Sequence, residues 1–440
     1  MSRRPAAGPS RAGEADDGRQ PRGRAGADRP RVRVALLGST GSIGRQAVEV
    51  LAGLRERFEV VALATGRDRE TLQAQAAALR PRVVALADDA GRAALQLPSG
   101  TELDDSPDAL IRMASRDDVD VVVVATGGVV SLRPVLAALR AGKVVATANK
   151  ETLVSGGHLV MPLARMLAER RRAGTTPGDP PDPWTSPLAW LRPIDSEHSA
   201  IWQCLAGERM SAIARIWLTA SGGPFRDLPA ADLARVTPEM ALAHPTWHMG
   251  AKITVDSATL MNKGLEIIEA DRLYDVGLAR ISVVIHPQSI VHSAVEFVDG
   301  SVKAQLGQPD MRIPIQYALT FPDRLPSPAP RLSLDELAAL TFDRPDADRF
   351  PALRIARDAG AAGARASAAL IAADEVAVRR FLGRSLDFPG IARLAGEAVE
   401  RFGAGPEPGP EELIALDAEV RTWCEAAPGT TPTSPPGTPG

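Results

Sequence analysis

The sequence predicts an α/β protein in three parts, and three features of the 440-residue chain lead to this prediction. Near the start, the apolar segment 31–37 is followed by a glycine-rich turn and by a helical pattern at 45–54. Further short, continuously apolar segments follow, as is typical of strands buried in a parallel sheet. Beyond residue 331 the chain is rich in alanine at helical spacing. We therefore expect a parallel-sheet domain, a central α+β domain and a C-terminal α-helical domain.

Composition argues against several classes of protein. A net charge of −3 gives no general attraction to nucleic acid or to an anionic membrane. No apolar run reaches the length of a membrane span. The two cysteines, Cys204 and Cys424, lie far apart and form no CxxC motif, which favours a reducing compartment. We expect a cytoplasmic protein that binds neither nucleic acid nor a membrane.

Changes in composition suggest where the domains begin and end. Residues 1–31 are rich in Arg, Ala, Gly and Pro without an apolar run, and we expect a disordered tail there. A second tail is expected at 427–440. Between the tails we predict a first domain at 32–175, a central domain at 176–330 and a helical domain at 331–426.

The glycine-rich turn has the context of a dinucleotide-binding motif. Residues 38–44 read GSTGSIG, directly after a predicted strand and before a predicted helix. In such a turn Gly38 permits the bend, Gly41 lets a pyrophosphate approach the backbone, and Gly44 allows the helix to pack closely on the strand. The spacing is GxxGxxG rather than GxGxxG, so a purely structural strand–helix turn stays an alternative.

The end of the second predicted strand, 59–64, bears on the choice of cofactor. An arginine there accommodates the 2′-phosphate of NADP, whereas an acid binds the ribose of NAD. Gly66 and Arg67 therefore favour NADP. Asp68 follows directly and weakens that preference, and ordinary surface charges stay an equal alternative.

Three carboxylates form a candidate metal site. Asp195 and Glu197 alternate about Ser196, so on an extended segment both would point the same way. With Glu266 they offer only oxygen ligands, which suit Mg²⁺ or Mn²⁺. Glu266 is distant in sequence, so solvated acids stay an equal alternative. His244 and His248 are four residues apart, but the segment lacks the helix and the Glu of a zinc HExxH motif.

The segment 244–270 concentrates polar side chains. We expect a short strand at 252–255 and a helix N-cap at Asp256 or Ser257. Gly264 would then lie in mid-helix, where it costs about 1 kcal/mol relative to Ala. We infer that a backbone or a ligand approaches closely at Gly264.

The same segment carries groups that suit a phosphate. Asn262, Lys263 and Glu266 share one face of the expected helix. Ser221, which ends a predicted strand before two glycines, and Ser257 add hydroxyl groups. Hydroxyls, an amide, an ammonium and a helix N-terminus together favour phosphate binding.

Two further expectations concern the central part of the chain. Strands are predicted at 283–293 and 295–305, with a hairpin turn at Asp299-Gly300. The Pro-, Gly- and Asp-rich segment 173–193 is expected to be a loop that Trp184 and Trp190 pack down.

Seven motifs together resemble the 1-deoxy-D-xylulose 5-phosphate reductoisomerase family, over residues 32–425. In chain order they are GSTGSIG, ATANKE, PIDSEHSAIWQ, LTASGGPF, HPTWHMGAKITVDSATLMNKGLE, IHPQSIVHS and LGQPDMR. The resemblance implies rearrangement and NADPH-dependent reduction of 1-deoxy-D-xylulose 5-phosphate to 2-C-methyl-D-erythritol 4-phosphate, in the non-mevalonate isoprenoid pathway. It also implies a Rossmann-type NADPH-binding domain, a central catalytic domain that binds metal and substrate, and a homodimer.

The resemblance assigns roles to individual residues. It implies Asp195, Glu197 and Glu266 as ligands of Mg²⁺ or Mn²⁺, with Lys150 as a further catalytic residue. The implied contacts of the sugar phosphate are Ser196, Glu197, Ser221, His244, Trp247, Ser257, Asn262, Lys263 and Glu266, with Trp247 in a mobile flap. The implied NADPH contacts are Thr40, Gly41, Ser42, Ile43, Gly66, Arg67, Asn149, Lys150, Glu151 and Gly250.

Three departures and two alternatives accompany the resemblance. The loop at 173–193 is longer than usual, Ser199 stands where many relatives have Asn, and Ile371 and Asp374 occupy positions often filled by Asn. A different NADP-dependent oxidoreductase, such as a semialdehyde dehydrogenase, would need a reactive cysteine, and Cys204 lies in an apolar run without a base. A non-catalytic dinucleotide sensor would be suggested by loss of one of the three carboxylates, and all three are present.

Overall fold

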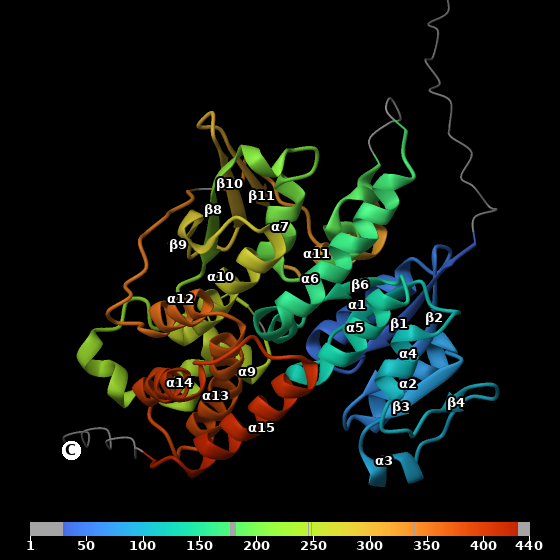
Figure 1. The fold of residues 1–440 in the computed structure, drawn as a ribbon, viewed down its shortest axis with the longest axis horizontal. Coiled ribbons are helices and arrows are strands. Elements are labelled where there is room, and N and C mark those ends of the chain that lie inside the picture. The colour runs from blue at the N-terminus through green and yellow to red at the C-terminus, as the bar shows by residue number, and fades with distance from the viewer. Residues whose placement is uncertain (1–29, 177–181, 245, 248, 338, 430–440) are drawn as a thin grey trace, which may run out of the picture.

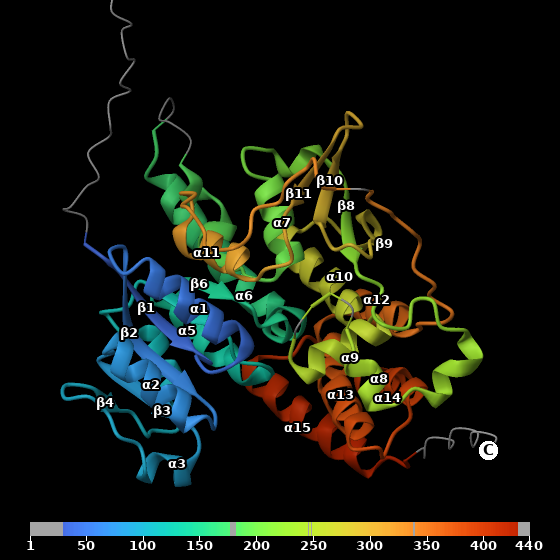
Figure 2. The ribbon, with the colours of Figure 1, turned by 180° about the vertical axis from the view of Figure 1, so that it is seen from behind.

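The computed structural model describes residues 30–176, 182–244, 246–247, 249–337 and 339–429. The parts of the predicted tails at 1–29 and 430–440, and His248 of the rejected zinc pair, lie outside these residues. Figures 1 and 2 show a sheet with its helices formed by the N-terminal part of the chain and a second sheet formed by the middle part. The last helices are gathered at one end of the molecule. Among the helices that the structure describes, none has the length and apolarity to cross a membrane.

The first sheet is entirely parallel and has seven strands in the order β4-β3-β2-β1-β5-β6-β7. This confirms the predicted α/β class. The strands are β1 (Val32–Leu37), β2 (Phe58–Thr65), β3 (Val83–Leu86), β4 (Glu102–Leu103), β5 (Val121–Val124), β6 (Val144–Thr147) and β7 (Leu191–Pro193). The helices between them are α1 (Ser42–Gly53), α2 (Arg69–Leu79), α3 (Asp89–Ala93), α4 (Ala109–Ser115), α5 (Leu132–Arg140) and α6 (Lys150–Ala173). Because β1 lies between β2 and β5, the strand order reverses there, which is where such sheets bind ligands.

Strand β7 joins this sheet from beyond the loop that follows α6. Trp184 and Trp190 pack edge to face with ring centroids 5.5 Å apart, and the Trp190 indole donates to the Trp184 carbonyl. The described part of the loop, which includes short 3₁₀ turns, is thus packed down as expected. The predicted domain limits stay a prediction, although β7 shows that the first sheet takes residues from beyond 175.

The second sheet has four strands in the order β11-β10-β8-β9. They are β8 (Ile213–Ala220), β9 (Ile281–Ile285), β10 (Val291–Phe297) and β11 (Val302–Leu306). The hairpin predicted at Asp299-Gly300 is confirmed, because β10 and β11 pair antiparallel around it. The single strand expected at 283–293 is wrong. His286 breaks it, because its ring accepts hydrogen bonds from the amides of Ile290 and Val291 and holds the chain in a loop.

Four helices come next: α7 (Ser196–Cys204), α8 (Pro238–Leu242), α9 (Ala251–Thr259) and α10 (Met261–Tyr274). Helices α7 and α10 pack on this sheet, α9 lines the cavity described below, and α8 packs against α9. The strand expected at 252–255 is wrong, because these residues belong to α9. Asp256 and Ser257 lie inside α9 and are not an N-cap. The helix ends at Leu260, whose φ of 60° turns the chain into α10. The β-branched residues at 253–255 suggested a strand, but burial of Val255 and its neighbours against the core outweighs this local preference.

The C-terminal part is helical, as predicted from its alanine-rich pattern. After α11 (Arg312–Thr320) come α12 (Ala352–Ala362), α13 (Ala364–Leu382), α14 (Phe388–Phe402) and α15 (Pro410–Ala426). The helical pattern was expected from residue 332, but the described residues between 331 and 351 form no helix. The prolines at 345 and 351 disfavour helix in this stretch.

Gly264 lies in mid-helix, and the expected close approach there is confirmed. A Cβ at this position would lie 2.5 Å from the Cβ of Ala356 on α12. The neighbour is therefore a packed helix, which the glycine allows to approach α10.

Candidate active site

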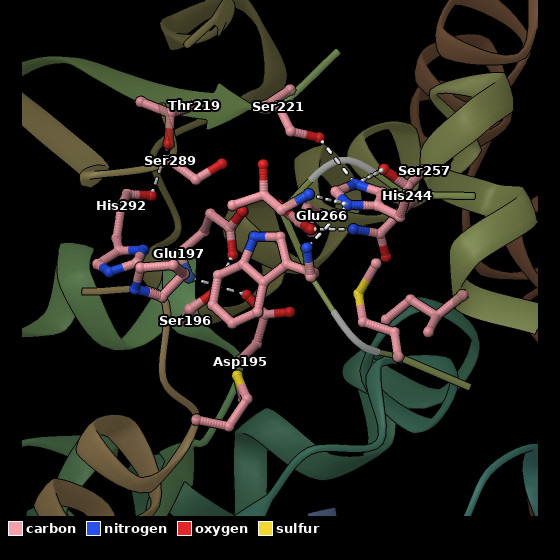
Figure 3. Close-up of a pocket in the computed structure, with 18 of the residues that line it drawn as sticks. Asp195, Ser196, Glu197, Thr219, Ser221, His244, Ser257, Glu266, Ser289 and His292 are labelled. Atoms are coloured by element: carbon pink, nitrogen blue, oxygen red, sulfur yellow. Dashed lines mark hydrogen bonds between the residues drawn. The ribbon is translucent and has the colours of Figure 1, made fainter. Parts of the chain in front are cut away.

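A cavity of about 430 Å³ lies where α1, α6 and the chain after β7 meet the second sheet and α10. Figure 3 shows carboxylates, hydroxyls and two histidines pointing into this space from several elements. Its lining includes all of the predicted catalytic and substrate-binding residues: Lys150, Asp195, Ser196, Glu197, Ser221, His244, Trp247, Ser257, Asn262, Lys263 and Glu266.

The three predicted metal ligands come together in this cavity. One oxygen from each of Asp195, Glu197 and Glu266 lies within 4.8 Å of the other two. Asp195 is the N-cap of α7 and accepts hydrogen bonds from the amides of Glu197 and His198. The expected extended segment is therefore wrong, since Glu197 lies in the first turn of a helix. The cap still places Asp195 and Glu197 close together at the start of α7. Both carboxylates lie near Glu266 on α10.

Two lysines neutralise part of this negative charge. Lys150 Nζ lies 3.2 Å from Asp195 Oδ2 and 3.5 Å from Glu266 Oε1. Lys263 Nζ lies 2.8 Å from Glu197 Oε1 and also contacts Glu266. With all five groups ionised, three carboxylates and two ammonium groups leave one negative charge in a largely buried site. An all-oxygen donor set with excess negative charge fits a hard divalent cation.

The carboxylates differ in their proton affinity. Burial, with repulsion from Glu197, raises the pKa of Glu266 to about 7. Burial acts in the same direction on Asp195, but Lys150, His198 and Lys263 together outweigh it and hold the pKa of Asp195 below its usual value. A cation bound among these groups would favour their ionised forms.

Ser221, His244 and Ser257 form a second group at the other end of the cavity. His244 Nε2 lies 3.1 Å from the hydroxyl oxygen of each serine. His244 Nδ1 accepts hydrogen bonds from the backbone amides of Thr246 and Trp247, which places the proton of the neutral ring on Nε2. Burial lowers the pKa of His244. This group offers hydroxyls and an N–H to an anion.

Asn262 and Lys263 line the same cavity but turn toward the carboxylates. The Asn262 amide donates to Glu266 Oε1 at 2.5 Å and its oxygen accepts from Lys150 at 2.5 Å. Lys263 contacts Glu197 and Glu266. The predicted phosphate-binding residues are therefore divided in this structure. One part lies beside His244 and the other beside the carboxylates.

The glycine-rich turn has the predicted tight geometry. Gly38 has a φ of +89°, and a Cβ there would lie 2.6 Å from the backbone of Ala125. A Cβ on Gly44 would lie 2.1 Å from the Gly38 carbonyl oxygen. A Cβ on Gly41 would meet its neighbours at ordinary contact distance, so the turn itself does not require glycine there. Gly41 begins α1 without a side-chain cap, and Ser42 and Ile43 of its first turn line the cavity.

The residues at the end of β2 bear on the choice between NADP and NAD. Asp68 is the N-cap of α2, where it accepts from the Thr71 amide at 3.0 Å. Its other oxygen pairs with Arg45 at 2.8 Å. Gly66 and Arg67 are exposed beside it. Asp68 is thus engaged in structural contacts, while the Arg67 side chain faces solvent.

The remaining predicted cofactor residues lie around the start of α6 and the start of α9. Asn149 caps α6, accepting from the Thr152 amide and donating to the carbonyls of Thr126 and Gly128. Its side chain is therefore engaged in backbone hydrogen bonds. Lys150 and Gly250 line the cavity, whereas the lining does not include Thr40, Gly41, Gly66, Arg67, Asn149 or Glu151.

Four residues of the site were missed by the sequence reasoning. Ser289 and His292 line the cavity, each 7% exposed, and the His292 ring lies 6.2 Å from the Trp247 ring. The motif IHPQSIVHS contains both residues, but the sequence assigned no role to either of them. Behind Asp195, buried His198 pairs with Glu269 at 3.0 Å. Burial opposes protonation of His198, but Glu269, together with Asp195 and Glu266, outweighs it and raises the pKa of His198 to about 9.

Comparison with known proteins decides the family. Three family models match: 1-deoxy-D-xylulose 5-phosphate reductoisomerase at 34–157, its C-terminal domain at 191–274, and the DXP reductoisomerase C-terminal domain at 306–423. A reductoisomerase of Pelotomaculum thermopropionicum is 49% identical over 88% of this chain and 96% of its own. The chain belongs to the 1-deoxy-D-xylulose 5-phosphate reductoisomerase family.

Other reductoisomerases agree with this assignment. The one from Heliobacterium modesticaldum is 47% identical over 89% of this chain and 96% of its own. A solved Zymomonas mobilis reductoisomerase in complex with NADPH has a TM-score of 0.78 and 37% identity, covering 90% of this chain and 99% of its own. A reductoisomerase solved with NADPH, fosmidomycin and magnesium has a TM-score of 0.79 and 36% identity, covering 90% of this chain and 98% of its own.

Membership of the reductoisomerase family also settles the alternative of a cysteine-dependent dehydrogenase. Cys204 is buried, and burial raises the pKa of its thiol to about 11. At neutral pH the sulfur is protonated and a poor nucleophile.

Proposed function

We propose that this chain catalyses the rearrangement and NADPH-dependent reduction of 1-deoxy-D-xylulose 5-phosphate to 2-C-methyl-D-erythritol 4-phosphate. The observation that carries the proposal is one cavity that holds the carboxylates Asp195, Glu197 and Glu266 at one end and the Ser221–His244–Ser257 group at the other. The cavity lies beside the first turn of α1, which follows the dinucleotide-type glycine turn. Metal, phosphate and cofactor therefore have distinct places around one substrate.

We assign Asp195, Glu197 and Glu266 as the residues that would hold Mg²⁺ or Mn²⁺. Their oxygen donors fit such an ion, and a solved relative contains magnesium. A divalent ion there supplies stabilisation of the negative charge that develops on the substrate oxygens. Lys150, whose ammonium lies between Asp195 and Glu266, adds positive charge on the same side.

The substrate phosphate is assigned to Ser221, His244 and Ser257. Two hydroxyls and the Nε2–H of His244 converge on one place, and Asn262 and Lys263 lie further along the cavity wall. Binding energy at the phosphate, remote from the reacting carbons, can orient the sugar for reaction. Ser196, at the start of α7 beside Glu197, is assigned to the sugar end.

NADPH is assigned to the first sheet. The open N-terminus of α1, with Thr40, Gly41, Ser42 and Ile43, suits a pyrophosphate. Exposed Arg67, beside Gly66, suits the 2′-phosphate. Asn149, Lys150, Glu151 and Gly250 are assigned to the part of the cofactor nearest the substrate. Trp247, which lines the cavity, would keep water from the reacting carbons.

We also propose that the protein works in the cytoplasm as a homodimer. Two buried, unpaired cysteines support a reducing compartment. Light scattering of the full chain would measure the assembly, and a monomer mass under assay conditions would contradict the dimer.

One assay tests the proposed activity. NADPH absorbance is followed with 1-deoxy-D-xylulose 5-phosphate, with Mg²⁺ or Mn²⁺ and then with a chelator. We expect oxidation of NADPH that depends on both the substrate and the metal. Absence of oxidation with metal present would overturn the proposal.

A further inference from the structure

Helix α9 is tied to the C-terminal helices by a buried group of charges. Lys252 Nζ lies 2.6 Å from Asp256 Oδ2 on the same helix and 2.7 Å from Asp374 Oδ2 on α13. The two aspartate side chains are 2% and 0% exposed, whereas the Lys252 side chain is 31% exposed. Figures 1 and 2 both show α9 beside α13.

The charges of this group do not balance. One ammonium faces two carboxylates. Among the described residues, Asp256 Oδ1 and both carboxylate oxygens of Asp374 have no hydrogen-bond partner, so Asp374 Oδ2 meets Lys252 as an ion pair only. A buried charge without compensation is strongly unfavourable, so such groups pair or become neutral. One added proton would bring the net charge of the group to zero and turn one unpaired acceptor into a donor.

The surroundings do not supply the missing positive charge. On α6, Lys150 and Glu151 both act on this region, and their charges oppose each other. On α13, Glu375 pairs with Arg421 of α15. The pKa of Asp256 is raised well above its usual value by burial and then by Asp374, against the opposing effect of Lys252.

The position of the group links it to the site. Asp256 is followed directly by Ser257, whose hydroxyl bonds to His244. Lys252 lies one turn earlier, two residues after Gly250 of the cavity wall. Gly223, close to Ser221, packs against the backbone of α9, and a Cβ on it would lie 2.7 Å from the Ser257 carbonyl oxygen. A shift of α9 would therefore move the Ser221–His244–Ser257 group.

We propose that Asp256 and Asp374 together hold one proton and, with Lys252, form a buried latch that fastens α9 to the C-terminal helices and positions Ser257. In this arrangement Lys252, Asp256 and Asp374 are positioning residues. Helices α12 to α15 contribute no residue to the cavity lining, yet through this latch they act on substrate binding.

The first test measures the proton through thermal unfolding between pH 6 and 9. The Asp374→Asn variant keeps an oxygen for Lys252 and removes the excess charge. Because the folded-state pKa of Asp256 is raised, the associated stability is present at low pH and is lost as pH rises through that pKa. We expect the Tm of the wild type to fall relative to Asp374→Asn as pH increases.

A matched control is Asp323→Asn, at an exposed aspartate paired with Arg57. Its Tm should follow the wild type at each pH. Parallel Tm curves for the wild type and Asp374→Asn would overturn the retained proton.

The second test measures positioning, and this part rests on the proposed function. Asp374→Leu removes the latch while filling its space, and Lys252→Met removes the cation from the side of α9. We expect the KM for 1-deoxy-D-xylulose 5-phosphate to rise about tenfold in both variants, equivalent to 1.4 kcal/mol. In Asp374→Asn it should stay within about twofold, since the latch is kept.

The two tests fail separately. An unchanged substrate KM in Asp374→Leu would overturn the positioning role. A wild-type protein without turnover would refute the proposed function. The thermal measurement would still show whether Asp256 and Asp374 retain the proton.

Discussion

Glu266 is the most enclosed of the three carboxylates of the site. Its side chain is fully buried on α10 and contacts Asn262 and Lys263, with Lys150 3.5 Å away. Its chemistry therefore depends on the carboxylate itself.

We expect Glu266→Gln to lower kcat by about 100-fold or more, since an anionic oxygen ligand becomes a neutral amide where transition-state charge is stabilised. NADPH binding should stay close to normal, because Glu266 lies apart from the turn before α1. Steady-state assays and a fluorescence titration with NADPH measure the two effects. Glu239→Gln, at an exposed side chain, is the matched control. Turnover retained in Glu266→Gln would exclude a metal-ligand role.

The burial of His244 leads to a prediction about how the stability of the protein depends on pH. Its folded-state pKa is lowered by burial, so above pH 6.5 the ring is neutral in both the folded and unfolded states. Below pH 6.5 the unfolded chain takes up a proton that the folded chain does not. Stability should therefore fall as pH decreases from 6.5 to the folded-state pKa.

An NMR titration measures this pKa directly. With six histidines in the chain, the His244 signal can be assigned by its loss in His244→Gln. Inorganic phosphate should raise the pKa of His244, because a bound anion favours the protonated ring. A free-protein pKa at or above 6.5 would contradict the burial argument.

At the scale of elements, the contact between α10 and α12 depends on one missing methyl group. Gly264→Ala should destabilise the protein by about 1–3 kcal/mol through overpacking against Ala356. Helix propensity alone would favour Ala by about 1 kcal/mol. Chemical denaturation measures the difference.

Two variants control this comparison. Gly53→Ala, at the end of α1 where a new Cβ meets nothing within 4 Å, should be neutral or stabilising. Ala356→Gly in the Gly264→Ala background should recover part of the loss. If Gly264→Ala were as stable as the wild type, the packing explanation would fail.

The elements also show where sequence reasoning succeeds and where it ends. The strand–turn–helix at 32–53 and the hairpin at Asp299-Gly300 were predictable because their signals are local. The helix at 251–259 was not, because its β-branched residues favour a strand and only tertiary burial makes them helical. The loop at 286–290 depends on a side chain bonding to backbone amides, which leaves no mark on hydrophobic periodicity.

At the scale of the whole molecule, the cavity draws on α1 and α6 beside the first sheet, on the second sheet and on α10. A ligand that contacts all of them binds only the folded protein and stabilises it by mass action. We expect Mn²⁺ to raise the Tm, by an amount corresponding to about 2.7 kcal/mol at a hundred times its Kd. Differential scanning fluorimetry measures this shift, and Glu266→Gln should reduce it. An equal shift in the variant would place the bound ion elsewhere.

The composition of the cavity was largely predictable from sequence, but its internal arrangement was not. The motifs identified Asp195, Glu197 and Glu266, and the structure brings their oxygens together. Spacing could not show that Lys263 turns toward the carboxylates instead of His244, because that depends on how the start of α7 is placed relative to α10. The ion pair between Lys252 and Asp374 joins positions 122 residues apart, and no local pattern records it.

The pairing of β7 with β6 has a consequence for how the chain tolerates change in length. Val145, Ala146 and Thr147 pair in register with residues 191–193, so the backbone position is reset two residues before Asp195. We therefore expect insertions or deletions between the end of α6 and η2 (Pro183–Thr185) to leave the position of Asp195 unchanged. This makes the stretch after Gly174 a suitable place to attach a reporter group without disturbing the chemistry.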